Sequence, residues 1–268
     1  MISDQFLRIS RLIGEEAVGA LTKKNVLIVG LGAVGGMCLE SLTRSGIGNF
    51  TLVDFDTVSI TNLGRQILAT HSAIGRKKCL VAKERVLDIN PACQVQALDM
   101  FCNSETIDEI FAKPFDLVID AIDSLNPKCD LLEYCYKHQV PVISCMGAAL
   151  RRNPQLVTTG ELFDTYGCPL AKQVRVRLRR RGVGRGIEVV YSPEITRFTY
   201  KDPKDEDNVD RNEQILDKGR VRNVLGSLPT VTAIFGQNMA HLALKKLSAD
   251  AQEFTGEAAF DARGKFNN

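Results

Sequence analysis

Short apolar or alternating runs follow one another between residues 25 and 147, and helical stretches separate them. The runs "NVLIVG", "FTLVD", "CQVQALD", "FDLVIDAID" and "VPVISCMG" have the length and pattern of strands. Between them, "AVGGMCLESLTRSG" and "GRKKCLVAKERVLDIN" place apolar residues at helical spacing, and "SETIDEIFA" predicts a helix capped by Ser104. This alternation predicts an α/β fold, a doubly wound, Rossmann-like parallel sheet with helices on both faces.

The pattern changes after Gly147. A helix with Pro169 in its first turn should stop at Gly182, and "IEVVYS" should form a further strand. Residues 201–220 are so polar that we predict a surface loop, and a final helix should begin near Pro229. That helix is apolar around much of its circumference, which predicts burial or a subunit interface. We expect two regions of one globular unit, residues 1–150 and residues 151–268.

Composition narrows the protein class. The 268 residues are 44% hydrophobic and 25% charged, with a net charge of +2, so a polyanion-binding surface requires local clustering. No uninterrupted apolar run of about 18 residues is present, which predicts a soluble, cytoplasmic protein without membrane association. The eight cysteines contain no C-x-x-C pair, so we expect buried free thiols instead of a tetrathiolate zinc site.

A glycine motif lies directly between a predicted strand and a predicted helix. "VLIVGLGAVGG" places Gly30, Gly32 and Gly35 in G-x-G-x-x-G spacing, which allows a tight turn and leaves free N–H groups for a phosphate. Asp54 ends the next strand, 24 residues after Gly30, where a carboxylate meets ribose hydroxyls. The motif alone fits a dinucleotide, ATP or S-adenosylmethionine.

Further polar residues follow the strand ends. Asn62 and Arg65 are three residues apart and would face the same direction on one helical turn, as phosphate recognition requires. Lys78 begins the next helix as a point charge suited to phosphate, and Asp123 follows a strand end where it could bind Mg²⁺. Together these residues favour a triphosphate over a dinucleotide.

"GLGAVGG", "DFDTVSITNLGRQ", "IGRKK" and "DAIDS", in this order, resemble the ubiquitin-activating-enzyme-like (ThiF/MoeB/HesA) superfamily. The resemblance implies an enzyme that binds ATP and Mg²⁺ and adenylates a carboxylate. It implies that Asp54 holds the ribose, that Asp123 binds magnesium, and that the phosphates are contacted by Asn62, Arg65 and Lys78. Asp56 and Gln66 belong to the same motif. "RISR", ending in Arg11, resembles an element that reaches into the partner subunit's site, which implies a homodimer.

The second half decides between branches of the superfamily. Residues 172–186 contain seven Lys or Arg and no acid, so this segment could neutralise several tRNA phosphates; we expect the contacts from Lys172, Arg175, Arg177, Arg179, Arg180 and Arg181. With "VVYSPE" and "TAIFGQNMAHLALKKL", it resembles the tRNA threonylcarbamoyladenosine dehydratase branch. That resemblance implies ATP-dependent activation of a threonyl carboxylate on tRNA, followed by cyclisation onto the carbamoyl group.

Two alternatives stay open. One is an adenylating enzyme for a ubiquitin-like sulfur carrier, although such enzymes typically carry two C-x-x-C pairs. The other is an inactive ATP-binding scaffold. A sulfur-transfer or redox protein partner also remains an open alternative. The chain departs from the branch at two places: it has Ala33 where glycine is common, and no cysteine near Val221, where some dehydratases have one.

Overall fold

A seven-stranded sheet forms the centre of the computed structural model, which describes residues 3–196 and 225–248. Its order is β3-β2-β1-β4-β5-β7-β6, and every neighbouring pair is parallel except β6 and β7. The strands are β1 (Asn25–Val29), β2 (Asn49–Val53), β3 (Gln94–Leu98), β4 (Leu117–Asp120), β5 (Val142–Cys145), β6 (Thr158–Glu161) and β7 (Glu188–Tyr191). The predicted doubly wound parallel sheet is thereby confirmed.

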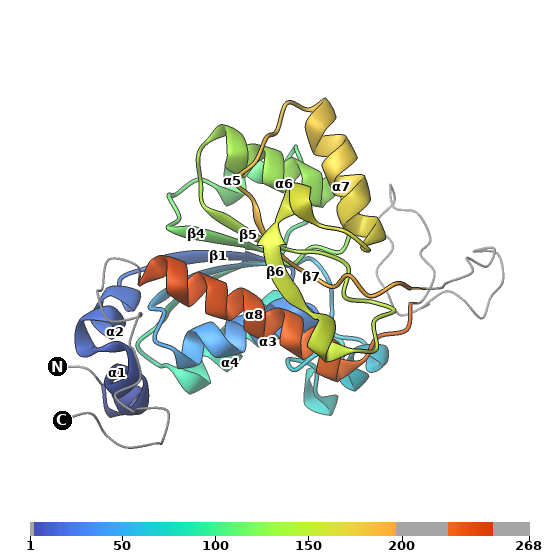
Figure 1. Ribbon diagram of the computed structural model, residues 1–268. Helices are drawn as coiled ribbons and strands as arrows, with labels where there is room; N and C mark the ends of the chain where they lie inside the picture. Colours follow the sequence, from blue (N-terminus) through green and yellow to red (C-terminus); the bar gives the residue numbers. More distant parts are fainter. Residues whose placement is uncertain (1–2, 197–224, 249–268) are drawn as a thin grey trace, which may run out of the picture.

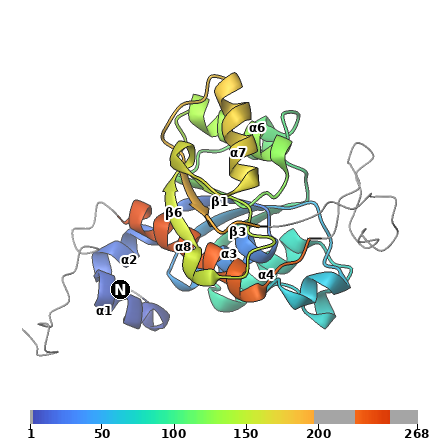
Figure 2. The same ribbon diagram turned by 45° about the vertical axis from the view of Figure 1, so that its right-hand side comes forward.

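Helices cover both faces of the sheet, as Figures 1 and 2 show. One face carries α1 (Leu7–Ile13), α2 (Glu15–Leu21), α3 (Ala33–Arg44), α4 (Lys78–Ile89) and α8 (Pro229–Leu247). The opposite face carries α5 (Ile107–Ile110), α6 (Leu125–Lys137) and α7 (Pro169–Arg180). Each layer has its own apolar core because buried strands present alternate side chains to the two faces. The short 3-10 helices are Asp4–Phe6, Ile60–Gly64, His71–Ala73, Pro154–Leu156 and Leu162–Asp164.

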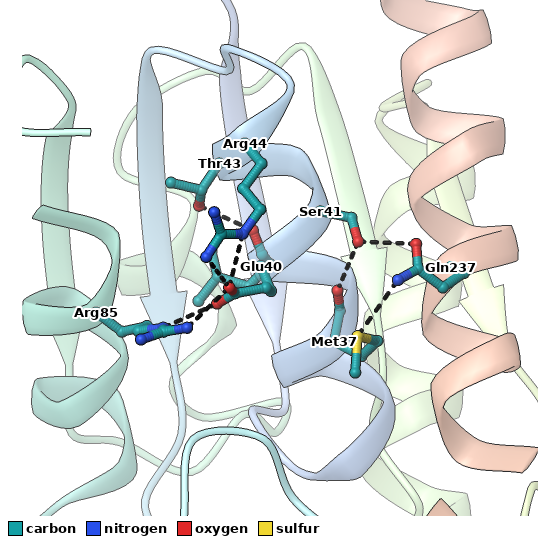
Figure 3. A network of polar contacts seen from close by, with 8 residues as sticks. Met37, Glu40, Ser41, Thr43, Arg44, Arg85 and Gln237 are labelled. Carbon is teal, nitrogen blue, oxygen red and sulfur yellow. Dashed lines mark hydrogen bonds and ion pairs between the residues drawn. The ribbon is translucent and has the colours of Figure 1, made fainter. Parts of the chain in front are cut away.

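The last helix, α8, lies directly against α3, the helix that follows the glycine motif. A Cβ on Gly236 would stand 2.6 Å from the Val34 carbonyl oxygen, so only glycine allows this close approach. Figure 3 shows the polar contacts that hold α3 on either side. Gln237 of α8 accepts a hydrogen bond from Ser41 at 2.9 Å, while Glu40 accepts hydrogen bonds from Arg85 of α4 at 2.9 and 3.0 Å. The C-terminal helix therefore helps to fix the position of α3.

Most predicted elements form where they were expected. The helix from Pro169 ends before Gly182, which has a φ of 76°, and the final helix begins at Pro229 as predicted. The sequence did not reveal β6, which has only four residues, two of them exposed and none buried. The prediction that Ser104 caps a helix is wrong, because α5 begins after Thr106. The Asn103 side chain instead accepts hydrogen bonds from the N–H groups of residues 105 and 106.

β6 and β7 extend the sheet that the first half builds, and the boundary at residue 150 stays a prediction. The predicted 201–220 loop and the position near Val221 lie outside the described residues. Within residues 3–196 and 225–248, no helix combines the length and apolarity needed to cross a membrane.

Candidate functional site

The glycine motif lies at the point where the strand order reverses. β1 pairs with both β2 and β4, so a crevice opens between the connections that leave these strands at their carboxyl ends. Gly30 has a φ of 91°, and a Cβ on Gly35 would lie 1.9 Å from its carbonyl oxygen, which makes both glycines necessary. Gly32 caps α3, and a Cβ there would meet only the Gln66 amide nitrogen at 4.0 Å. The turn therefore leaves room for a ligand at the N-terminus of α3.

Asp54 is held at the carboxyl end of β2 beside this turn. Its carboxylate accepts hydrogen bonds from the Leu31 N–H at 2.6 Å and the Asp56 N–H at 2.8 Å. Burial raises the pKa of Asp54, an effect that the positive charge of Lys78 partly opposes. Each oxygen keeps a second lone pair, so the carboxylate can still accept a hydroxyl proton from a ribose.

Lys78 reaches this carboxyl pair from the start of α4. Its side chain is buried, and Nζ lies 2.9 Å from an oxygen of Asp56. Asp54, Asp56 and Lys78 are therefore gathered at one strand end, as the motif implied. A buried ammonium beside two carboxylates needs an ion pair to offset the loss of hydration, and Asp56 supplies it here.

The stretch after β2 differs in detail from the prediction. Ile60–Gly64 is a 3-10 helix that ends before Arg65, so Asn62 and Arg65 do not share the expected helical turn. Asn62 is buried, and its side-chain oxygen accepts the Ser59 N–H at 3.1 Å. Arg65 is half-buried and donates to the Thr61 carbonyl oxygen at 3.0 Å. Asn62 therefore holds the turn, and the buried Gln66 lies beside the glycine turn, with its amide nitrogen 4.0 Å from where a Cβ on Gly32 would stand.

Asp123 lies just beyond β4, on a loop that a buried network supports. Lys128 on α6 has its Nζ 2.6 Å from an Asp120 oxygen, and the Ser144 hydroxyl donates to the same oxygen at 2.5 Å. The other Asp120 oxygen accepts the Ile122 N–H at 3.1 Å, which fixes the chain next to Asp123. All three side chains of the network are fully buried.

Sequence reasoning missed this network, although a signal was present. Lys128 stands three residues after Leu125 and four before Leu132, on the apolar side of α6. A lone lysine at such a position predicts a buried acidic partner, because an unpaired ammonium is costly in a core.

Asp123 itself is exposed and accepts a hydrogen bond from the Ser124 hydroxyl at 3.1 Å. Among the described residues, no three His, Cys, Asp or Glu side chains cluster in a way that would hold a metal ion by themselves. A single carboxylate at the edge of a crevice fits Mg²⁺, which keeps several waters and takes phosphate oxygens as further ligands. The donor set is therefore compatible with magnesium only in the presence of a nucleotide.

Arg11 is not brought to this crevice within its own chain. It is exposed on α1, and α1 packs beside α2. α8 touches the first turn of α3 through Gly236, and its far end approaches α2 (Figure 1). The part of α8 from Gly236 to Leu247, roughly 16 Å of helix, therefore separates α2, and α1 beside it, from the crevice.

The basic segment 172–186 spans most of α7 and the loop after it, and although it contains no acid, distant acids pair with two of its cations. Arg181 pairs with Asp130 at 2.7 Å and Glu133 at 2.9 Å, and Arg185 pairs with Asp164 at 2.6 Å. Arg175 and Arg177 donate hydrogen bonds to Thr165 and Asn126. The exposed cations on α7 itself are Lys172, Arg179 and Arg180, with the Arg179 guanidinium 5.1 Å from the Phe163 ring centre.

Known proteins resemble this chain in sequence and in fold. The ThiF family matches residues 5–265. The tRNA threonylcarbamoyladenosine dehydratase of Bacillus subtilis is 41% identical over 71% of this chain and 75% of its own length. A crystal structure of E. coli tRNA N6-threonylcarbamoyladenosine dehydratase with AMP has a TM-score of 0.81 and 33% identity, and covers 94% of this chain and 98% of that chain. The E. coli enzyme is also known with ATP. The E. coli molybdopterin-synthase adenylyltransferase is 35% identical over 58% of this chain and 64% of its own length.

Proposed function

The chain belongs to the ThiF family, and from this membership we propose that it is an ATP-dependent tRNA threonylcarbamoyladenosine dehydratase that acts as a cytoplasmic homodimer. The observation that carries the proposal is the reach of the sequence likeness. The E. coli dehydratase is 32% identical over 90% of this chain and 92% of its own length, whereas the adenylyltransferase matches 58% of this chain. The second half is where the substrate of an adenylating enzyme would be chosen.

The crevice suits displacement of pyrophosphate from ATP by a carboxylate. Asp54 accepts the ribose hydroxyls, and the amides at the start of α3 receive a phosphate. Arg65 and Lys78 stabilise the negative charge that grows on the α-phosphate and the leaving group. Asp123 would hold Mg²⁺, which supplies further charge neutralisation when bound. We assign these roles on the placement of the side chains around one crevice.

The proposed reaction has two bond exchanges. A carboxylate oxygen of the threonyl group forms a bond to the α-phosphorus, and the bond to pyrophosphate breaks. A nucleophilic atom of the carbamoyl group then attacks the activated acyl carbon, AMP leaves with the carboxylate oxygen, and a proton is released. The ring that forms lacks one water relative to the starting nucleoside. Basic groups of α7, above all Lys172, Arg179 and Arg180, would contact the tRNA phosphates.

A sulfur-carrier adenylating enzyme is the second candidate, because the molybdopterin-synthase adenylyltransferase shares the nucleotide half. The absence of any C-x-x-C pair from the sequence speaks against it. An inactive ATP-binding scaffold is the third candidate. A sulfur-transfer or redox protein partner is compatible with any of the three.

Nucleoside digestion after incubation separates these candidates. The protein, ATP and Mg²⁺ are incubated with tRNA that carries threonylcarbamoyladenosine, and the digested nucleosides are measured by mass spectrometry. We expect the modified nucleoside to lose the mass of one water. An unchanged nucleoside would contradict the proposal. ATP–pyrophosphate exchange that needs an added ubiquitin-like protein would favour the second candidate, and tight ATP binding without turnover would favour the scaffold.

A further inference from the structure

Arg151, six residues beyond the end of β5, is a buried cation that the fold leaves largely without acceptors. Its side chain is only 2% exposed. Within the described residues it makes one hydrogen bond, from Nε to the Gly147 carbonyl oxygen at 3.4 Å, and no salt bridge. The Nη1 amino group is buried and has no hydrogen-bond partner. A guanidinium loses much of its hydration on burial, so an unpaired amino group there is unfavourable unless a ligand supplies the acceptor.

The backbone on both sides of Arg151 is held in place. Leu150 has a φ of 64°, which is uncommon for a residue other than glycine, and its N–H donates to the Gly226 carbonyl oxygen at 2.8 Å. The N–H groups of Arg152 and Asn153 both donate to the Glu194 carboxylate at 3.1 Å. The Glu194 charge is thus directed to the backbone instead of to the Arg151 side chain. A strained and firmly bonded segment is typical of a side chain that has been placed for function.

The order of the strands gives Arg151 its place in the crevice. The nucleotide residues follow β2, β1 and β4, and β5 is the next strand outward. Arg151 is tied to the carboxyl edge of the sheet by its hydrogen bond to the Gly147 carbonyl oxygen, two residues beyond the end of β5. On the other side, a Cβ on Gly147 would lie 3.5 Å from the Cys168 sulfur, just before α7. The loop that carries Arg151 therefore leaves the sheet beside β4, which Asp123 follows, and passes next to the start of α7.

We propose that Arg151 binds the substrate carboxylate that attacks the α-phosphate, an inference that rests on the proposed function. An anionic ligand is favoured, because the unfilled group is a donor on a cation and its hydrogen bonds to a charged oxygen are stronger than those to a neutral acceptor. The phosphates already have Arg65, Lys78 and the α3 amides on the β2 and β1 side. A guanidinium can hold the two oxygens of a carboxylate in one orientation, which suits Arg151 to a carboxylate ligand.

The test compares Arg151→Met and Arg151→Lys with Arg152→Met in the full-length protein. Arg152 is the matched control because it is adjacent and exposed, and the hydrogen bonds it makes within residues 3–196 and 225–248 involve its backbone N–H alone. Turnover of tRNA that carries threonylcarbamoyladenosine gives kcat and KM, calorimetry gives the Kd of ATP, and thermal unfolding gives Tm. We expect Arg151→Met to lower kcat/KM for the tRNA about 100-fold and to leave the Kd of ATP within about twofold.

Two further readouts exclude a merely structural role. Arg151→Met should keep or raise Tm, because it removes an unpaired buried charge. Arg151→Lys should recover about tenfold of the loss, because an ammonium restores the charge but not the paired contact. Arg152→Met should stay within about twofold of the wild type.

Failure of the Arg151 assignment can be distinguished from failure of the proposed function. If the wild type is active, the assignment is overturned by unimpaired turnover of Arg151→Met, by an ATP Kd that rises in parallel with the loss of kcat/KM, or by a drop in Tm. A wild-type protein that does not dehydrate the nucleoside would overturn the proposed function and the assignment that rests on it.

Discussion

Lys128→Met should destabilise the fold because it removes the cation from the buried network under the Asp123 loop. The Lys128 Nζ lies 2.6 Å from Asp120 and 3.3 Å from the Ser144 hydroxyl, and the lysine and aspartate side chains are both 0% exposed. Methionine fills a similar volume without a charge, so the change isolates the electrostatic loss. The Asp120 carboxylate would keep only the Ser144 hydroxyl and the Ile122 N–H as donors.

Leaving one partner of a buried ion pair unpaired costs about 3–5 kcal/mol of unfolding free energy. In a chain of this size, each kcal/mol lowers Tm by about 2–4 °C, so Lys128→Met should lower Tm by about 6–20 °C. The double variant Asp120→Asn/Lys128→Met should recover most of this loss. It leaves no buried charge, and the Asn side-chain oxygen can still accept the Ile122 N–H.

Urea unfolding followed by circular dichroism measures these differences, with the Kd of ATP as a second readout. Lys137→Met is the matched control: it lies on the same helix, pairs with Glu133 at 2.6 Å and is 60% exposed, so it should cost less than about 1 kcal/mol. A loss of unfolding free energy in Lys128→Met no larger than in Lys137→Met would refute the stabilising role of the buried pair. A double variant less stable than Lys128→Met would also refute it, since removing the carboxylate charge should relieve the penalty.

Three further predictions concern the stability of the protein at acidic pH, the basic helix α7 and the proposed dimer. Burial favours a higher pKa for Glu40, but hydrogen bonds from Arg85 and Arg44 outweigh burial and lower this pKa. The charged Glu40 therefore stabilises the fold above about pH 4.3, and this stabilisation is lost as the pH falls through the lowered pKa. Glu40→Gln should flatten the acidic part of the curve of unfolding free energy against pH. Glutamine substitutions at the exposed α7 cations Lys172, Arg179 and Arg180 should weaken tRNA binding and reduce the slope of log K against log salt concentration by about 2–3. Arg185→Gln, which removes a paired charge, should change this slope by less than about 1, and equal slopes for the two proteins would contradict the prediction. Arg11→Ala and Asp123→Ala proteins, each inactive, should regain activity when mixed, and continued inactivity despite verified subunit exchange would refute a trans role for Arg11.

Much of the fold follows from local sequence, because strand and helix periodicities and glycine requirements are properties of short segments. The glycine turn is an example: a φ of 91° at Gly30 and the contact with Gly35 could be expected from G-x-G-x-x-G spacing alone. Asp54 and Lys78 could also be placed, because the carboxyl ends of parallel strands meet at one edge of a sheet. β6 escaped prediction because an exposed four-residue strand carries no apolar pattern.

Contacts between side chains far apart in the sequence could not be predicted in the same way. The sequence shows seven cations and no acid in residues 172–186, but the acids that pair with Arg181 and Arg185 come from α6 and from the segment after β6. Asn62 and Arg65 were expected to act together, yet a 3-10 helix turns the amide of Asn62 back to its own loop. Such pairings depend on which distant segments meet, and residue spacing alone does not contain that information.

By itself, the sequence determined the fold class, the nucleotide crevice and the family, since these depend on periodicity and on motifs whose members lie within a few residues of one another. Tertiary structure alone decided that Lys128 and Asp120 form a buried pair, which α7 cations stay exposed, and that Arg151 is buried with an unfilled donor. The physical reason is that burial and charge pairing depend on contacts between segments far apart in the chain. Whether a charge is solvated, paired or left for a ligand is settled only when the helices pack on the sheet.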